Sequence, residues 1–168
     1  MRLDKLTTKL QEALADAQSQ AVCNDNQYIE PVHVLLALIN QDDGGARSLL
    51  QRAGINMNGL LNGLKSAVDR LPKVTGTDGQ VQIGRELAGL LNLADKESQK
   101  RGDQFLASEM VLLALVDDKS EAGKLARENG LTRSALEAAI KGVRGGVNVD
   151  SPEAEGQREA LKKYTLDL

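Results

Sequence analysis

The sequence is poor in aromatic residues and carries no excess of positive charge. Its aromatic side chains are Tyr28, Phe105 and Tyr164, with no tryptophan, and 21 Lys and Arg stand against 24 Asp and Glu, which gives a net charge of −3. Proteins that bind nucleic acids stack bases on aromatic side chains and follow the phosphates with a basic surface. The composition therefore indicates that nucleic acid is not a partner.

The sequence also lacks paired cysteines, a secretory signal and long hydrophobic runs. Cys23 has no second cysteine for an internal disulfide, and the start of the chain has no basic stretch followed by an apolar one. The longest apolar run covers 32–39 and contains His33, whereas a membrane span needs about 18 consecutive apolar residues. We expect a cytoplasmic protein without a membrane segment.

Motifs of common enzymes are missing as well. One histidine and one cysteine cannot complete a structural zinc site, and the sequence has neither a G-x-S-x-G nucleophile motif nor a G-x-x-x-x-G-K-[ST] phosphate loop. His33 is interpreted as a packed or surface side chain and not as a ligand. Cys23 is interpreted as an inert thiol, because no further histidine could activate it. We expect no catalytic residue, metal or cofactor on this chain.

Apolar residues with helical spacing run through most of the sequence. They recur at Leu3, Leu6 and Leu10 on one face of an amphipathic helix, Pro31 suits the first turn of the next helix, and Gly54 suits a helix end. No segment shows the alternation of a strand. The predicted helices cover residues 3–24, 31–39, 46–53, 56–68, 84–101, 108–117, 121–129 and 133–143.

The second half of the chain repeats the pattern of the first. The residues Val34–Leu38 (VLLAL) return as Val111–Leu115 at an offset of 77 positions, and Tyr28 aligns with Phe105. The sequence therefore predicts an all-α fold, an eight-helix domain of two pseudo-repeated four-helix units. The units cover about 3–71 and about 83–144, and residues 145–168 have the composition of a flexible linker, which Gly145 and Gly146 begin.

Positions at which the two copies differ in polarity are candidates for function, because the shared fold does not require them. Leu93 stands where the first copy has Asp16, and it lies well off the apolar stripe of its helix. We interpret Leu93 as an exposed binding residue; the alternative is that it packs against the other half of the chain or is an ordinary surface leucine. Three further positions differ: Met110 replaces His33, Asp103 replaces Asn26 and Glu109 replaces Val32.

Several segments resemble the amino-terminal part of bacterial disaggregases of the ClpB family. They are 1–7 (MRLDKLT), 29–35 (IEPVHVL), 100–105 (KRGDQF) and the ending 160–168 (ALKKYTLDL), so that the resemblance covers the whole chain. The double repeat alone is shared with other Clp ATPases, whereas the Arg144-Gly-Gly linker and the ending are more specific to the ClpB family. The resemblance implies that residues 1–144 are a substrate-binding Clp N-terminal domain and that 145–168 lead to an AAA+ module.

The resemblance also implies an activity for the longer protein. It would be a homohexameric, ATP-driven cytoplasmic chaperone of the heat-shock response that threads unfolded or aggregated polypeptides through its pore together with the DnaK system. ATP and Mg would bind to the AAA+ modules, while the present chain would be non-catalytic and monomeric. The alternative is an adaptor-docking or regulatory domain, as in Clp ATPases linked to proteolysis.

Six residues match positions to which the family assigns a role. The resemblance implies an apolar groove for unfolded segments at Leu91, Leu93 and Met110, and a polar cluster tied to chaperone activity at Thr7, Asp103 and Glu109. Glu97 departs from the family pattern, because this position tends to be apolar, and we expect it to give the groove a charged edge. Each polar residue also has a purely structural interpretation: Thr7 bonding its own backbone, Asp103 capping a turn and Glu109 favouring a helix dipole.

Overall fold

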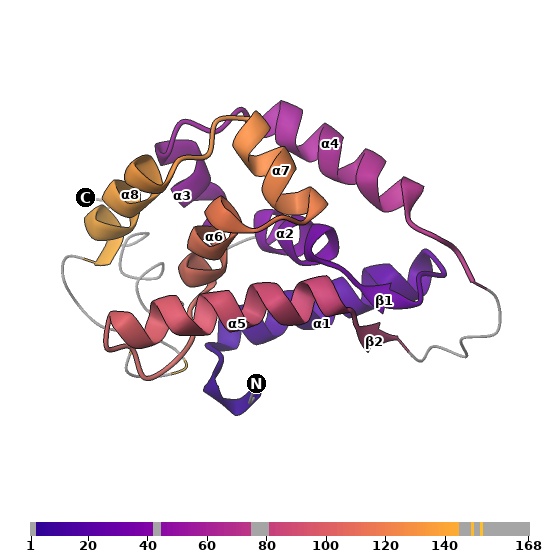
Figure 1. Cartoon of the computed structure of the whole chain (residues 1–168), viewed down its shortest axis with the longest axis horizontal. Helices are drawn as coiled ribbons and strands as arrows, with labels where there is room; N and C mark the ends of the chain where they lie inside the picture. The colour runs from indigo at the N-terminus through magenta and orange to yellow at the C-terminus, as the bar shows by residue number, and fades with distance from the viewer. Residues whose placement is uncertain (1–2, 42–44, 75–80, 145–148, 150–151, 153–168) are drawn as a thin grey trace, which may run out of the picture.

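The structure is a computed structural model that describes residues 3–41, 45–74, 81–144, 149 and 152. In this part of the chain the predicted all-α fold is confirmed (Figure 1). A short 3-10 helix, Leu3–Lys5, comes before the first α-helix. The α-helices are α1 (Thr8–Cys23), α2 (Pro31–Asn40), α3 (Ala46–Arg52), α4 (Met57–Arg70), α5 (Arg85–Lys100), α6 (Ser108–Asp117), α7 (Glu121–Glu128) and α8 (Arg133–Arg144).

The two four-helix units share one core. In the first unit α1 packs on α2, and in the second the equivalent α5 packs on α6. The short helix of each unit then packs against the last helix of the other, α3 on α8 and α7 on α4. Each unit therefore covers apolar surface that the other would leave in water, and the central helices α2 and α6 are buried along almost their whole length.

The start of the chain differs from the prediction of one helix over 3–24. Leu6 lies in extended backbone that bridges to Leu106, and α1 begins only after Thr7. The Thr7 side chain accepts a hydrogen bond of 3.3 Å from the Leu10 N–H, which is the usual role of a helix N-cap. Leu3 and Leu6 continue the apolar spacing of the helix but belong to a segment that is held by main-chain bonds.

Two short strands were not predicted. The strands β1 (Tyr28–Ile29) and β2 (Gln82–Ile83) pair in parallel. Strand β1 lies just before α2 in the sequence, and β2 lies just before α5. A strand of two residues is too short to show alternation, so periodicity could not reveal it. The pair joins the two repeats at one end of the molecule (Figure 1).

Most helix ends follow the local signals of the sequence. Gly54, Gly102 and Gly130 have positive φ after α3, α5 and α7, as the predicted stops require. The side chains of Asn56 and Thr132 accept hydrogen bonds from N–H groups in the first turns of α4 and α8. None of the helices in the described ranges is both long enough and apolar enough to span a bilayer.

Candidate functional site

Only one of the three apolar residues assigned to the groove is accessible. Leu93 is 38% exposed, whereas Leu91 is 3% exposed and Met110 is fully buried. In this structure Leu91 and Met110 therefore line no open groove, and their role in client binding stays a prediction. Leu91 belongs to the buried stripe of α5, and Met110 lies in α6, which contacts α5, α7 and α8.

The three polar residues are also buried, and an arginine that sequence analysis missed explains two of them. The Arg144 guanidinium lies 2.8 Å from Asp103 (Nη2 to Oδ2) and 2.8 Å from Glu109 (Nε to Oε1). The side chains of Arg144, Asp103 and Glu109 are 7%, 0% and 3% exposed. We call these residues the ionic triad; Thr7, the third predicted polar residue, is fully buried as the N-cap of α1.

The electrostatics of the triad favour its charged form. Burial alone would lower the pKa of Arg144, but the charge of Glu109 and the hydrogen bonds that Arg144 donates to both carboxylates outweigh burial and raise this pKa above its usual value. A buried ion pair is stable only when its geometry and hydrogen bonds compensate for lost hydration. The triad is thus a structural unit that joins the loop before α6, the first turn of α6 and the last turn of α8.

The first repeat has a neutral counterpart of the triad. Asn26, Val32 and Val68 stand at the positions equivalent to Asp103, Glu109 and Arg144. There, Asn26 Oδ1 lies 3.0 Å from Nε2 of the buried His33, and the Glu30 N–H donates to His33 Nδ1 at 2.9 Å. The two repeats therefore differ in polarity at these positions because each contains its own buried polar network. The sequence comparison interpreted this difference as one between two surfaces.

His33 is a packed side chain, which is one of the two positions that the sequence left open. Because Nδ1 accepts the Glu30 N–H, Nε2 carries the proton and donates to Asn26. Burial lowers the pKa of His33 to about 4. Cys23 is exposed, and among the described residues no group of His, Cys, Asp and Glu is arranged to hold a metal ion.

An apolar groove that the sequence did not reveal lies where α1 meets the strand pair. Its volume is about 340 Å³, and we call it the α1–β2 groove. Two large apolar side chains are exposed on the strands themselves, Tyr28 at 43% and Ile83 at 44%. The groove is lined by Leu6, Gln11, Leu14, Ala15, Gln18, Ile29, Val81 and Ile83.

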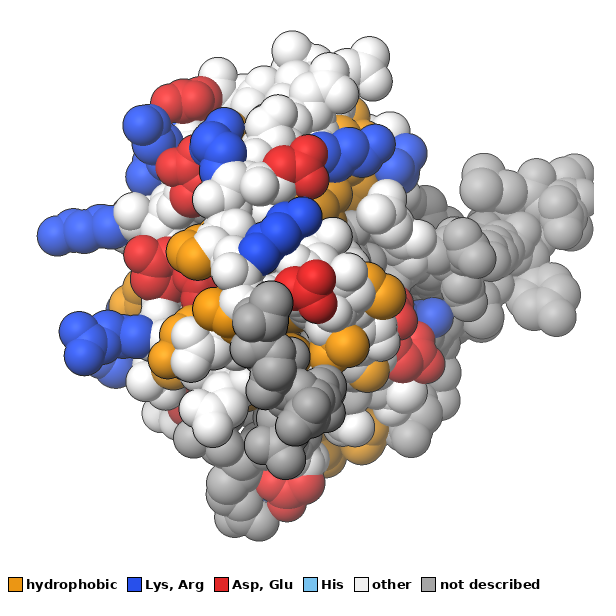
Figure 2. Space-filling model, turned by 90° about the vertical axis from the view of Figure 1, so that its right-hand side faces the viewer, with side chains coloured by type: hydrophobic (Ala, Val, Ile, Leu, Met, Phe, Trp, Pro, Cys, Tyr) orange, Lys and Arg blue, Asp and Glu red, His pale blue; other side chains and the backbone are white. Residues whose placement is uncertain are grey.

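The groove was missed because part of its lining comes from residues next to the inter-repeat stretch. Val81 and Ile83 flank Gln82 between the predicted helices 56–68 and 84–101, and their apolar character was the available signal. The end of the molecule that carries β1 and β2 shows hydrophobic side chains set between charged ones (Figure 2). An apolar surface that is surrounded by polar residues suits the binding of an apolar partner segment.

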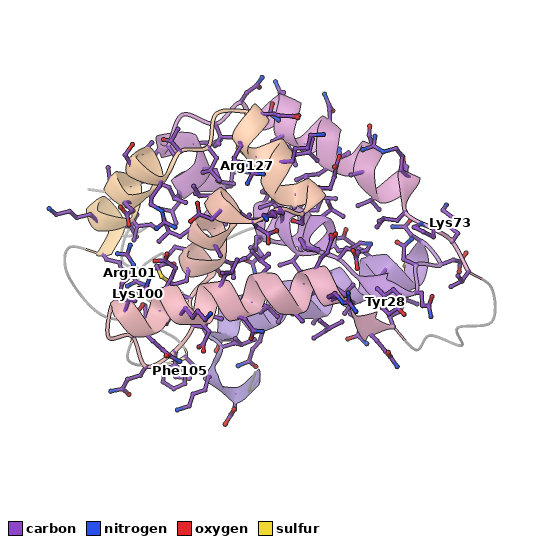
Figure 3. The ribbon with its side chains drawn as sticks, viewed as in Figure 1. Tyr28, Lys73, Lys100, Arg101, Phe105 and Arg127 are labelled. Carbon is purple, nitrogen blue, oxygen red and sulfur yellow. The ribbon has the colours of Figure 1, made fainter. Side chains whose placement is uncertain are left out.

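The equivalent aromatic residues of the two repeats have different surroundings. Tyr28 lies near the strand pair, whereas Phe105 lies below the opposite half of α5 (Figure 3). Phe105 is half-buried and has the Lys5 ammonium 5.9 Å from its ring centre, whereas Tyr28 is exposed. Of these two aromatic side chains, only Tyr28 in the first repeat is thus openly exposed.

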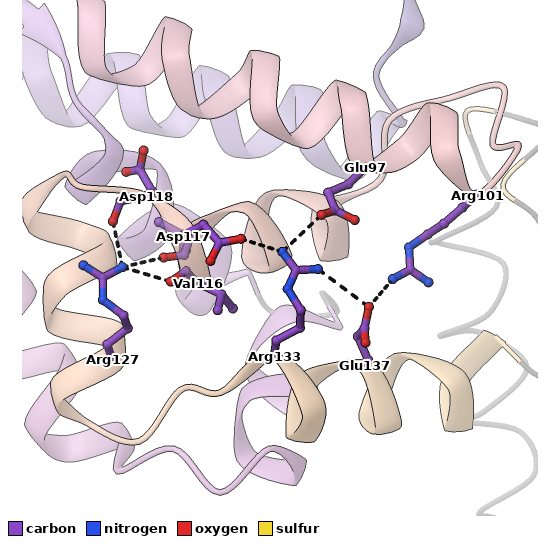
Figure 4. A network of polar contacts seen from close by, with 9 residues as sticks. Glu97, Arg101, Val116, Asp117, Asp118, Arg127, Arg133 and Glu137 are labelled. Carbon is purple, nitrogen blue, oxygen red and sulfur yellow. Dashed lines mark hydrogen bonds and ion pairs between the residues drawn. The ribbon is translucent and has the colours of Figure 1, made fainter.

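Glu97 does not leave an open charge beside Leu93. Its carboxylate lies 3.1 Å from Arg133, which also pairs with Asp117 at 2.8 Å and with Glu137 at 3.7 Å, and Arg101 pairs with Glu137 at 2.7 Å (Figure 4). The hydrogen bond with Asp117, followed by the contacts with Glu97, raises the pKa of Arg133. Glu97 therefore belongs to a network of two arginines and three carboxylates across α5, α6 and α8.

A second arginine closes the carboxyl end of α6. Arg127 Nη1 donates to the carbonyls of Leu115 and Val116 at 3.1 Å each and to that of Asp118 at 2.7 Å (Figure 4).

We expect Arg127→Met to lower the free energy of unfolding by about 1–3 kcal/mol, because carbonyls at a helix end would lose a charged donor. Urea denaturation measures this loss. Lys124→Met on the exposed side of α7 is the control, and an equal loss in both variants would contradict the role of Arg127.

The comparisons with known proteins place the chain in a family. The family model of the Clp repeat (R) N-terminal domain matches residues 5–129. The chain belongs to the Clp N-terminal domain family. It is 49% identical over all 168 residues to the N-terminal region of the chaperone protein ClpB of Pseudomonas putida, so the predicted resemblance is confirmed. The chain spans 20% of the length of that relative.

Solved structures share the fold of this Clp N-terminal domain. The Hsp104 N-terminal domain from Candida albicans superposes with a TM-score of 0.76 at 21% identity, covering 90% of this chain and 99% of that one. The N-terminal domain of the caseinolytic protease associated chaperone ClpD from Arabidopsis thaliana gives a TM-score of 0.60 at 19% identity, covering 82% and 96%. At these identities the likeness extends to the fold alone.

Proposed function

We propose that this Clp N-terminal domain binds apolar segments of unfolded polypeptides for a ClpB-type chaperone. The observation that carries the proposal is the α1–β2 groove, which is lined in part by the exposed side chain of Ile83. A single-domain protein gains nothing in stability from leaving such side chains in water. Leu93, which is 38% exposed on α5, is a second proposed contact.

The proposal extends to the longer protein through its relatives. It would be an AAA+ ATPase that assembles as a homohexamer in the cytoplasm, binds ATP and Mg in modules beyond this chain, and threads aggregated polypeptides with the help of the DnaK system. The 49% identity to a ClpB chaperone supports this proposal. The present domain would itself be non-catalytic and would act in client capture during the stress response.

Capture by this domain should be weak. Burying two or three apolar side chains yields roughly 3–9 kcal/mol, from which the cost of association and of ordering the client must be subtracted. A weak site suits a client that has to be released for threading. Several copies in one ring would restore overall affinity through effective concentration.

Substitution of the exposed apolar residues tests the proposal. We expect Ile83→Ser to weaken binding of unfolded casein about tenfold, since the loss of one buried apolar contact costs roughly 1.5 kcal/mol. Leu93→Ser should weaken binding to a smaller or similar extent. Chemical-shift perturbations of the ¹⁵N-labelled chain, titrated with casein, give both the affinity and the place of binding.

Matched controls separate binding from folding. Gln82→Ser and Asn92→Ser change the exposed neighbours of Ile83 and Leu93 without removing an apolar side chain. Neither serine variant of the apolar residues should change the free energy of unfolding by more than about 0.5 kcal/mol, because both side chains are at the surface. If casein perturbs neither the α1–β2 groove nor the surroundings of Leu93, the proposal fails.

A second candidate function is docking of a folded adaptor. The N-terminal domain of a protease-associated chaperone, ClpD, shares this fold. A domain of this kind would bind a folded partner and give no response to unfolded casein. The same titration therefore discriminates between the two functions.

A further inference from the structure

The chain that follows α8 returns to the body of the domain at two described residues. Val149 is 2% exposed, and its N–H donates to Asp103 Oδ1 at 3.0 Å. Its carbonyl accepts the N–H groups of Gln104 at 3.0 Å and Phe105 at 3.2 Å. Pro152 then accepts the N–H of Thr8, at the start of α1, at 2.8 Å.

The ionic triad prepares Asp103 for this contact. Asp103 Oδ1 accepts from Arg144 Nη1 at 3.1 Å and from the Val149 N–H at 3.0 Å, while Oδ2 faces Arg144 Nη2. Because Arg144 holds the carboxylate in place, the Val149 N–H meets a fixed, charged acceptor in a site sheltered from water. Hydrogen bonds to a charged acceptor of this kind are stronger than those between neutral groups.

The loop that receives Val149 is itself tied to the start of the chain. The Thr7 N–H donates to the Leu106 carbonyl at 2.9 Å, and the Leu106 N–H donates to the Lys5 carbonyl at 2.7 Å. Backbone from three distant parts of the sequence thus meets beside α1. We call the contacts of Val149 and Pro152 with Asp103, Gln104, Phe105 and Thr8 the exit clasp.

We propose that the exit clasp fixes the direction in which the chain leaves the domain, and that Thr7, Asp103 and Glu109 are positioning residues of this clasp. The exit direction would then be set at Val149 and Pro152. Gly145 and Gly146, at which the linker was expected to begin, lie outside the described residues. The buried polar cluster would act on whatever follows the domain by orienting it, and it would make no direct contact with a client.

A proline at position 8 removes one clasp bond with little disturbance elsewhere. Thr8 is the first residue of α1, where a helix does not use the N–H and tolerates proline well. The preceding residue, Thr7, has φ −63° and ψ 158°, which a following proline allows. Thr8→Pro thus deletes the donor to Pro152, and Thr8→Ala, which keeps the N–H, is the matched control.

The rate of amide hydrogen exchange at Val149 reports whether the exit clasp is formed. In the unmodified chain we expect the Val149 amide to exchange at least about tenfold more slowly than in an unstructured peptide, and Thr8→Pro to accelerate its exchange about fivefold. Thr8→Ala should leave the rate unchanged. Val149→Gly, which removes the buried side chain and keeps both backbone groups, should likewise accelerate exchange at position 149.

The direction in which the chain leaves the domain is measured separately by electron paramagnetic resonance. Spin labels on the native, exposed Cys23 and on a cysteine introduced by Glu153→Cys report the distance between the body and the exit. We expect a narrow distance distribution in the chain with Thr8 or Thr8→Ala and a broad one with Thr8→Pro. Fast exchange of Val149 in the unmodified chain, or equal distributions in all variants, would overturn the proposal. Casein binding by Ile83 and Leu93 is unaffected by either outcome, so the proposed function is tested independently.

Discussion

Arg144→Met is expected to lower the free energy of unfolding by about 3–5 kcal/mol, the range found when one partner of a buried ion pair is removed. The substitution leaves Asp103 and Glu109 facing each other in a site where their side chains are 0% and 3% exposed. Neither carboxylate could regain full hydration without opening the packing of α8 on α6. Urea denaturation followed by circular dichroism at pH 7 measures the loss.

The first repeat supplies a matched control for this loss. A triple variant with Arg144→Val, Asp103→Asn and Glu109→Val copies the equivalent residues Val68, Asn26 and Val32. Because it removes both uncompensated charges together with the arginine, we expect it to recover most of the stability that Arg144→Met loses. Equal destabilisation of the triple and single variants would mean that packing of the Arg144 stem, and not charge, is what matters.

The helices could be predicted from the sequence because their signals are local. Apolar spacing, N-caps such as Asn56 and Thr132, and the glycines Gly54 and Gly130 act within one or two turns of the residues they define. The repeat then indicated how the helices pair. The start of α1 was misplaced because Leu6 continues the apolar spacing while its backbone bonds to a loop a hundred residues away, near Leu106.

The site was less accessible to prediction because burial depends on tertiary packing. Met110 looks like a candidate binding residue until the helices that pack on α6 are known. Leu91 is buried in the apolar stripe of α5. Asp103 and Glu109 look like surface acids until Arg144, distant in sequence, is placed between them. The comparison of the two repeats singled out Asp103 and Glu109 because their polarity differs from that of the first copy, but such a difference also arises when two buried networks use different chemistry.

His33 is expected to make the domain sensitive to acid. Its pKa is about 4 in the folded protein, because the side chain is buried, and 6.5 in the absence of such burial. Above pH 6.5 both states hold a neutral histidine, so His33 adds no pH dependence there. As the pH falls from 6.5 towards 4 the unfolded state takes up the proton first, and stability is lost by up to about 3 kcal/mol.

Denaturation midpoints between pH 7 and pH 4.5 measure this loss, and His33→Met is the informative comparison. Methionine is the residue of the second repeat at the equivalent position, Met110, which is fully buried in its own helix. The variant loses the bond to Asn26 and should be less stable at pH 7, but the slope of stability between pH 6.5 and 5 should be much shallower. If both proteins have the same slope in that window, protonation of other groups governs the acid response, since His33 is the only histidine in the sequence.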